Sequence, residues 1–232
     1  MRHVKSVKII CGGWICDMDK RTLIRRIINY VIFLSVTGSW IYMAFFAEER
    51  GLSSRGIASL KFYTVLSNFL AAISSAVYLM TEKRPQLRGK AETFKFMGLV
   101  TVSLTFTVVL LFLGPLFTYR FVYSGAGLFM HLIVPILCAV EYLFLTEQHL
   151  SYRSIYLPLG FTFLYGAIYL INVIINGPGS YPDANDFYSF THWGLGVGIL
   201  IFAVICVLIV FISFIYLKAH IDILPRRKSW DS

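Results

Sequence analysis

Hydrophobic positions along this chain gather into six long runs, and the stretches between them hold most of the charged residues. Each run is close to the roughly 20 residues that a helix needs to cross the hydrocarbon core of a bilayer. The pattern therefore predicts an all-α, polytopic membrane protein with a bundle of six transmembrane helices. The predicted spans run from Ile27 to Ala47, Leu60 to Met80, Phe94 to Leu113, Ala126 to Thr146, Ser154 to Ile175 and Trp193 to Leu217.

The composition excludes most soluble classes of protein. Of the 232 residues, 57% are hydrophobic and only 14% are charged, whereas a soluble domain has about 25% charged residues. Six spans of about 20 residues leave only short connections and tails, with no room for a separate soluble enzyme. We therefore predict a basic cytoplasmic N-terminal tail over 1–26, a six-helix domain over 27–217 and a basic cytoplasmic C-terminal tail over 218–232.

The distribution of basic residues predicts the orientation. All but four of the 21 Lys and Arg residues lie in the two tails, around the second connection or in the fourth connection. The positive-inside rule then places both termini in the cytoplasm. The protein is expected in the plasma membrane if it is bacterial, and in the endoplasmic reticulum or plasma membrane if it is eukaryotic. The four Lys and Arg residues on the opposite side of the membrane are Arg50, Arg55, Lys61 and Arg120.

A net charge of +9 does not indicate nucleic acid here, because the basic residues flank the spans and do not form one basic face. Their expected partners are anionic lipid headgroups. Cys138 and Cys206 lie within spans, whereas Cys11 and Cys16 lie in the basic tail, where palmitoylation is the special role we expect. No metal-ligand spacing accompanies them, so we predict neither a metal nor a cofactor.

Polar side chains within three spans recur every three or four residues, which places each set on one helical face. Polar groups in a membrane helix usually face the bundle interior, so the three faces are expected to meet. The sets are Thr64, Asn68, Ala71 and Ser75; His131, Pro135, Cys138 and Tyr142; and Tyr165, Tyr169, Asn172 and Asn176.

Two of these residues lie at matching depth. A rise of about 1.5 Å per residue puts Thr64 about 6 Å and His131 about 7 to 8 Å below the outer boundary. The fifth span brings Asn172 and Asn176 to the same level, and the loop that follows carries Asp183, Asp186 and His192. We therefore expect polar groups to converge in the outer leaflet.

A hydroxyl and an imidazole at one depth form a possible nucleophile and general base for acyl transfer. Asn68 lies one turn deeper and is a candidate oxyanion donor. Structural alternatives exist for each residue. His131 can satisfy the backbone defect that Pro135 creates, threonine often bonds its own helix, and Asn68 can join helices, as can the buried Glu141.

Three segments resemble one protein family. They are Phe62-Tyr63-Thr64-Val65-Leu66-Ser67-Asn68, His131-Leu-Ile-Val-Pro135 followed by Glu141-Tyr142, and the outer-loop Tyr181-Pro182 leading to Asp183. In order and spacing they resemble the androgen-induced-gene and androgen-dependent TFPI-regulating protein family of multipass membrane hydrolases, and most closely its bacterial branch. The basic tail over 1–26 has no counterpart in that pattern.

The resemblance implies hydrolysis of lipid esters, notably fatty acid esters of hydroxy fatty acids, by an intramembrane threonine and a histidine. Those catalytic roles correspond to Thr64 and His131, without a cofactor. Two rival hypotheses remain: a small membrane transporter or channel that uses the same polar interior, and a non-catalytic membrane scaffold. Candidates for substrate binding or for the oxyanion are Asn68, Tyr63, Asn172, Asn176, Asp183 and His192.

Overall fold

A computed structural model describes residues 6–11, 14–46, 56–180 and 184–230. Within these residues, six helical segments are long and apolar enough to cross a membrane. The predicted all-α polytopic fold is therefore confirmed. The six segments are Lys20–Phe45, Tyr63–Thr81, Pro85–Leu116, Ala126–Leu145, Tyr152–Asn176 and Leu195–Ile223.

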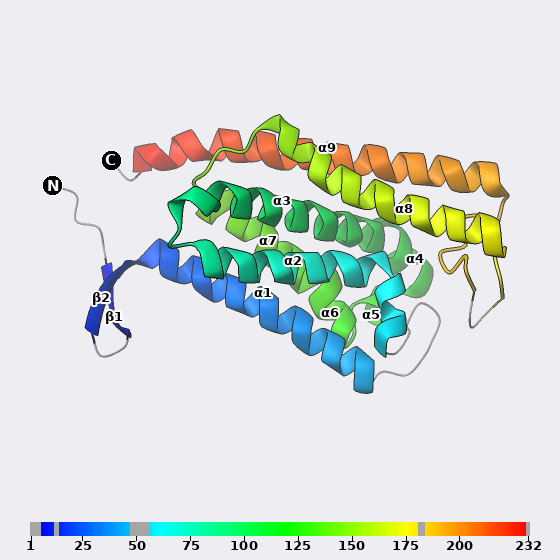
Figure 1. Ribbon diagram of the computed structural model, residues 1–232, viewed down its shortest axis with the longest axis horizontal. Coiled ribbons are helices and arrows are strands. Elements are labelled where there is room, and N and C mark those ends of the chain that lie inside the picture. Colours follow the sequence, from blue (N-terminus) through cyan, green and yellow to red (C-terminus); the bar gives the residue numbers. More distant parts are fainter. Residues whose placement is uncertain (1–5, 12–13, 47–55, 181–183, 231–232) are drawn as a thin grey trace.

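The helices form one elongated bundle (Figure 1). Helices α1 (Lys20–Phe45), α2 (Tyr63–Thr81) and α3 (Pro85–Val108) pack against one another, and α8 (Tyr156–Asn176) and α9 (Leu195–Trp230) lie side by side on one flank. The beginning of α1 and the end of α9 are at the same end of the bundle. This arrangement agrees with two termini on one side of the membrane.

A short hairpin precedes α1. Strands β1 (Ser6–Cys11) and β2 (Trp14–Asp19) pair antiparallel, with Ser6 opposite Asp19. The sequence pattern predicts a basic tail over these residues and no strands, so the hairpin is a difference from that expectation. The hairpin lies beyond the end of the helix bundle (Figure 1), so it adds a small extramembrane element to the predicted organisation.

Three helices extend further than hydropathy predicted. Helix α1 begins at Lys20, α3 begins at Pro85, and α9 continues to Trp230, so the predicted domain limits at 26/27 and 217/218 both fall inside helices. Hydropathy detects the hydrocarbon region, whereas a helix continues wherever its residues favour it. Ion pairs stabilise the extension of α1, such as Arg26 with Glu82.

The third and fourth spans each contain a π-helical turn before a proline. Pro115 follows η2, and Pro135 follows η3, which contains His131. A proline ring clashes with the carbonyl four residues earlier, and a π turn widens the helix at that point. The pieces are η2 (Val109–Leu113) and α4 (Gly114–Phe117), then α6 (Ala126–Leu128), η3 (Phe129–Ile133), α7 (Val134–Val140) and η4 (Glu141–Leu145).

Small residues let α2 and α3 approach closely. A Cβ at Gly98 of α3 would lie only 3.0 Å from the Ala71 Cα and 2.9 Å from the Ser74 Oγ. Asn68 and Ser75 are fully buried on the same face of α2, as the spacing of that face predicted. Three short elements complete the chain: η1 (Gly56–Lys61), α5 (Tyr119–Val122) and η5 (Tyr152–Ile155).

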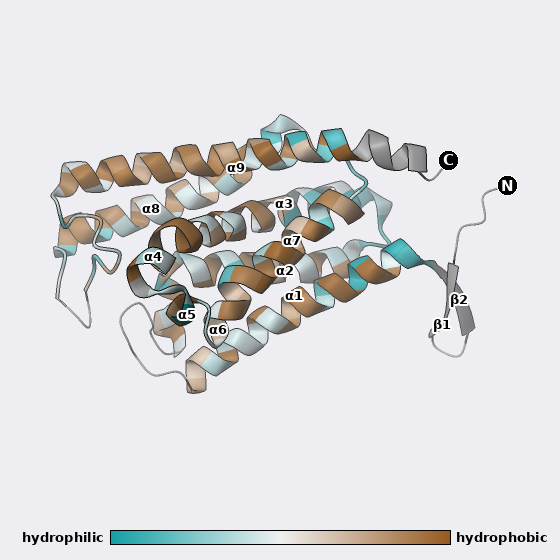
Figure 2. Ribbon diagram, turned by 180° about the vertical axis from the view of Figure 1, so that it is seen from behind, coloured by the Kyte–Doolittle hydropathy of each residue, from teal (hydrophilic) through white to brown (hydrophobic). Residues whose placement is uncertain are grey.

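The outer surface of the bundle is apolar, most visibly along α9 (Figure 2). Large side chains such as Val207 and Phe211 are more than half exposed there. Soluble proteins rarely expose contiguous apolar area on this scale. The exposed face of α9 is therefore the face that contacts lipid.

Candidate active site

Thr64 is the second residue of α2, at the end of the bundle away from the start of α1. Other intramembrane threonines bond their own helix: Thr101 donates to the Met97 carbonyl at 3.0 Å, and Thr107 to the Ser103 carbonyl at 2.8 Å. The half-buried Thr64 hydroxyl makes no hydrogen bond within the described part of the chain. Its position at the helix start gives it no carbonyl one turn earlier in α2, so the hydroxyl is left available.

His131 is held by one of its two ring nitrogens. Its Nδ1 lies 2.8 Å from the carbonyl oxygen of Val122 in α5. A carbonyl only accepts hydrogen bonds, so in the neutral ring Nδ1 carries the proton and donates it. The other nitrogen, Nε2, is then the unprotonated one, with its lone pair available as a base.

Gly127 makes the contact with Val122 possible. It lies one turn before His131, and a Cβ at this position would be 2.4 Å from the Val122 oxygen and 3.4 Å from the His131 Nδ1. The chain before it reverses direction through Gly125, whose φ is +51° and therefore suits glycine. This tight reversal carries the Val122 carbonyl onto the imidazole.

Asn68 joins the two helices that carry Thr64 and His131. Its side-chain amide donates to the Thr64 carbonyl at 2.8 Å and to the Met130 carbonyl at 3.1 Å. Met130 directly precedes His131, so one buried amide fixes the backbones of both candidate residues. The two side chains themselves make no hydrogen bond to each other within the described residues. Catalytic hydrogen bonds are often long before substrate binds.

The sequence also suggested Asn68 as an oxyanion donor. Both of its amide hydrogens are engaged by backbone carbonyls, so donation to an oxyanion would require one of those bonds to break. Its Oδ1 is buried without a partner among the described groups. The geometry therefore gives Asn68 a positioning role between the helices.

Tyr63 contacts α8 and the loop that follows it. Its hydroxyl lies 2.7 Å from the Thr162 Oγ1 of α8, and its backbone N–H donates to the Tyr188 hydroxyl at 2.9 Å. Tyr165 donates to the Lys61 carbonyl at 2.6 Å. Within the described residues, the start of α2 thus contacts α8 through Tyr63 and Lys61, and not through the predicted face of Thr64, Asn68, Ala71 and Ser75. These contacts join the two helices.

The asparagines of α8 tie the helix end to the following loop. Asn176 donates to the Asn172 side chain at 2.8 Å, and Asn172 donates to Asn185 at 3.3 Å. Both asparagines were candidates for substrate binding, but their side chains are engaged in these structural hydrogen bonds. Asp183 lies outside the described residues, and His192 is exposed, with its ring 5.0 Å from that of Trp193.

Asp186 anchors the outer loop. It accepts hydrogen bonds from the Thr191 hydroxyl at 2.5 Å, from the Thr191 and Phe190 N–H groups, and from Tyr169. Burial would raise the pKa of Asp186, but these hydrogen bonds outweigh burial and hold the pKa below its ordinary value. Phe187 of this loop packs against Phe62, with the two ring centres 5.2 Å apart.

Four charged side chains form a second polar region, which we call the inner ionic cluster. Arg25 bonds both oxygens of Glu92, at 2.5 and 2.6 Å, and its Nε donates to Glu141 at 2.9 Å. Lys95 lies 2.7 Å from the other oxygen of Glu141. Asn29 donates to Glu141 at 2.8 Å. Two positive and two negative charges therefore neutralise one another between three spans.

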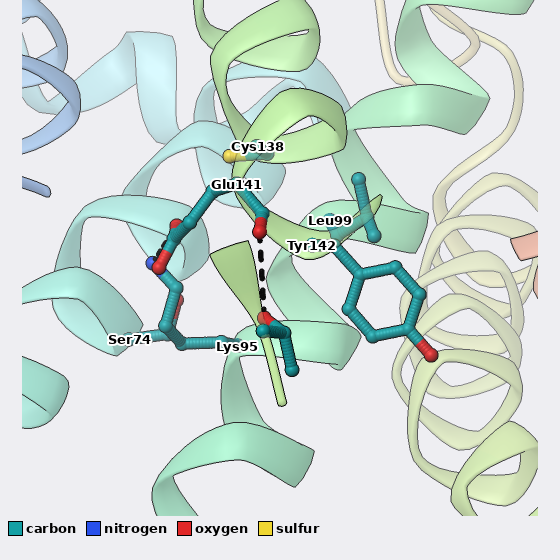
Figure 3. A pocket seen from close by; sticks show the side chains of 7 residues that line it. Ser74, Lys95, Leu99, Cys138, Glu141 and Tyr142 are labelled. Carbon is teal, nitrogen blue, oxygen red and sulfur yellow. Dashed lines mark hydrogen bonds and ion pairs between the residues drawn. The ribbon is translucent and has the colours of Figure 1, made fainter. Parts of the chain in front are cut away.

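The sequence pattern indicates that Glu141 is buried but does not predict this cluster. By hydropathy, Arg25 and Lys95 are flanking charges on the cytoplasmic side, and Glu92 lies just before the predicted third span. Their depths provide a signal, because Arg25, Glu92 and Lys95 all fall within three turns of a helix start on the same side. Lys95 and Glu141 face each other beside a small cavity that has room for about one water molecule (Figure 3).

Within the described residues no group of three or more His, Cys, Asp or Glu side chains could hold a metal ion. The side chains at Thr64 and His131 are instead a hydroxyl and a neutral base in the outer third of the bundle.

No family model, curated protein or solved structure matches this chain.

Proposed function

We propose that this protein hydrolyses lipid esters inside the membrane, with Thr64 as nucleophile and His131 as general base. The observation that carries the proposal is a pair of unused polar atoms at one depth. The Thr64 hydroxyl is free of its own helix, and the bond from His131 Nδ1 to Val122 leaves Nε2 as the basic nitrogen. Asn68 holds both backbones in one register.

The reaction would have two steps. His131 takes the proton of Thr64 as the Thr64 oxygen bonds to the ester carbonyl carbon, and the ester C–O bond then breaks while His131 protonates the departing alcohol. Water next attacks the acyl-threonine, giving its proton to His131. The carboxylic acid leaves, and Thr64 regains its proton. The net reaction consumes one ester and one water.

The position of the pair suits a lipid substrate. Ester groups of amphipathic lipids lie near the membrane boundary, and both residues lie within about 8 Å of it by helix rise. The resemblance of the Thr64 and His131 segments to the androgen-induced-gene family suggests the substrate class, fatty acid esters of hydroxy fatty acids. The apolar surroundings of Thr64, such as Phe62 and Val65, suit their alkyl chains.

The test is hydrolysis of a branched fatty acid ester by purified protein in detergent, with both products quantified. Thr64→Ala and His131→Ala should each lower turnover by about 100-fold or more, because removal of a nucleophile or a general base has effects of that size. Thr107→Ala and His149→Ala are matched controls: Thr107 bonds its own helix, and His149 is exposed at the opposite end.

Unchanged turnover in Thr64→Ala, with the protein monodisperse, would reject the nucleophile. Loss of turnover in Thr107→Ala as well would indicate damage to the fold and not to the chemistry. Thr64→Ser, which keeps the hydroxyl, should retain part of the activity. A mass-spectrometric acyl adduct on Thr64 would identify the intermediate directly.

Transport is the second candidate function, and the inner ionic cluster favours it. Ionisable residues inside a membrane often mark an ion or proton path. Here every charge in the cluster contacts an opposite charge, and the adjoining cavity is only water-sized. Substrate flux into proteoliposomes that persists in Thr64→Ala but stops in Glu141→Gln would favour transport over hydrolysis.

A further inference from the structure

An apolar groove of about 660 Å³ lies between α8 and α9. Its walls include Leu159, Gly160 and Phe163 of α8 together with Ile199, Phe202 and Ala203 of α9. Helices α8 and α9 lie along one flank of the bundle (Figure 2), and Tyr156, Phe163 and Ile199 are each more than half exposed, so the groove is open at the apolar surface of the protein. Its volume is in the range of small-ligand sites.

Gly160 lines the groove, and no neighbouring atom among the described residues requires a glycine at this position. A Cβ at Gly160 would meet no atom within 4 Å. Gly166, two turns further along α8, differs, because a Cβ there would lie 2.0 Å from the Phe202 ring. Glycine costs about 1 kcal/mol in a helix relative to alanine. The close approach of the helices explains Gly166, whereas no contact within the described residues requires glycine at position 160.

Two cations lie beyond one end of the groove, one on each side of the junction between α8 and α9. Tyr156 lines the groove, and Arg153 lies three residues before it in η5. Tyr152 stacks on Phe214 of α9 at 6.0 Å, and Lys218 follows Phe214 by one turn. Arg153 and Lys218 therefore lie beyond the same end of the groove, Arg153 next to it and Lys218 about 18 Å along α9 from Cys206, the last groove residue of that helix.

Both cations are exposed and lack an acidic partner among the residues that the structure describes. Other arginines at this end are paired, such as Arg21 and Arg88 with Glu147. The nearest acid along α9 is Asp222, one turn beyond Lys218 and also exposed. The surface beyond this end of the groove thus retains net positive charge, on the side where the positive-inside rule predicts anionic lipid.

We propose that this groove binds an anionic glycerophospholipid from the leaflet on the side of the termini. One acyl chain lies along Gly160 and Phe163, and the phosphate contacts Arg153 and Lys218. The distance along α8 from Tyr156 to Phe163 is about 10 Å by helix rise, which is most of one leaflet's ~15 Å of hydrocarbon. The site is separate from Thr64 and His131 and does not depend on their chemistry.

The experiment uses the full chain in nanodiscs that contain phosphatidylglycerol with a photoactivatable diazirine in one acyl chain. Crosslinked peptides are mapped by mass spectrometry, with the same probe on phosphatidylcholine as a comparison. We expect adducts on the α8 and α9 groove residues, at a yield several-fold higher for phosphatidylglycerol. A lysine or arginine near an anionic surface contributes about a five-fold preference.

Gly160→Leu should abolish the groove adducts by filling the space. Gly38→Leu is the matched control, because Gly38 is also a lipid-exposed helical glycine whose Cβ would meet nothing within 4 Å. Arg153→Gln combined with Lys218→Gln should remove the preference for phosphatidylglycerol. Each variant is first shown to be monodisperse, with wild-type thermal stability.

Two results would overturn the proposal. Uniform labelling of all lipid-facing helices, unaffected by Gly160→Leu, would mean that only bulk lipid contacts the groove. Equal groove labelling by phosphatidylglycerol and phosphatidylcholine in the wild type would reject recognition of the anionic headgroup. Hydrolysis assayed on the same samples shows separately whether the Thr64 site is active.

Discussion

The inner ionic cluster and the outer site at Thr64 and His131 lie at opposite ends of the bundle. In the inner cluster, each charged side chain contacts an opposite charge, and Glu141 is also bonded by Asn29. In the outer site, the Thr64 hydroxyl and one ring nitrogen of His131 have no partner among the described residues. Satisfied groups stabilise a fold, whereas unsatisfied and accessible groups remain free to react.

The largest expected effect is a loss of stability when a charge of the inner ionic cluster is removed. Glu141→Ala should lower the free energy of unfolding by about 3–5 kcal/mol, because it leaves the largely buried Lys95 without its counter-ion. Unfolding in detergent, followed by circular dichroism, measures the change. Glu141→Gln should cost less, since an amide still accepts from Arg25. A loss below about 1 kcal/mol would show that the cluster is not a main stabilising element.

The next variant, at Asn68 in the outer site, should change both ester turnover and stability. Asn68→Leu removes the hydrogen bonds that the Asn68 amide donates to the Thr64 carbonyl in α2 and to the Met130 carbonyl in η3. It should lower ester turnover by about 10- to 100-fold, because misplacement of about 1 Å can have such an effect. Its stability loss should be about 1–3 kcal/mol. Kinetics and unfolding measured on one preparation separate the two effects. Wild-type turnover would exclude a positioning role for Asn68.

Gly127→Ala tests how His131 is held. The added methyl would meet the Val122 oxygen at 2.4 Å and displace the acceptor of the His131 Nδ1. We expect turnover to fall about ten-fold, with a shift in the pH dependence of the rate because the tautomer is no longer fixed. Gly160→Ala, which meets nothing, serves as the control. A pH profile identical to wild type would count against the anchor.

The smallest effect concerns the outer loop. The native pKa of Asp186 is lowered, so its stabilising contribution is present above the ordinary aspartate pKa of 3.8 and is lost as pH falls through the lower native value. The amides of Phe190 and Thr191 should therefore lose hydrogen-exchange protection only below about pH 4. Asp186→Asn should reduce their protection at neutral pH. Asp222→Asn, at an exposed helix position, should leave it unchanged.

Helical periodicity predicted the relation between Thr64, Asn68 and His131 in part. The spacing placed Asn68, Ala71 and Ser75 on one face, and all three are buried. It could not show which backbone groups Asn68 bonds, because the Met130 carbonyl comes from another span. Periodicity also could not predict the hydrogen bond between the His131 ring and the Val122 carbonyl, because that bond depends on the chain reversal through Gly125.

The sequence by itself determined that the chain crosses a membrane six times, because the length of each apolar run must match the thickness of the bilayer. It also predicted the side of the termini, through the position of its basic residues. Only the tertiary structure decided which polar groups are satisfied. Pairing of Arg25 with Glu92 and Glu141 joins residues far apart in sequence. Such contacts depend on how helices rotate and pack, which periodicity within one helix does not specify.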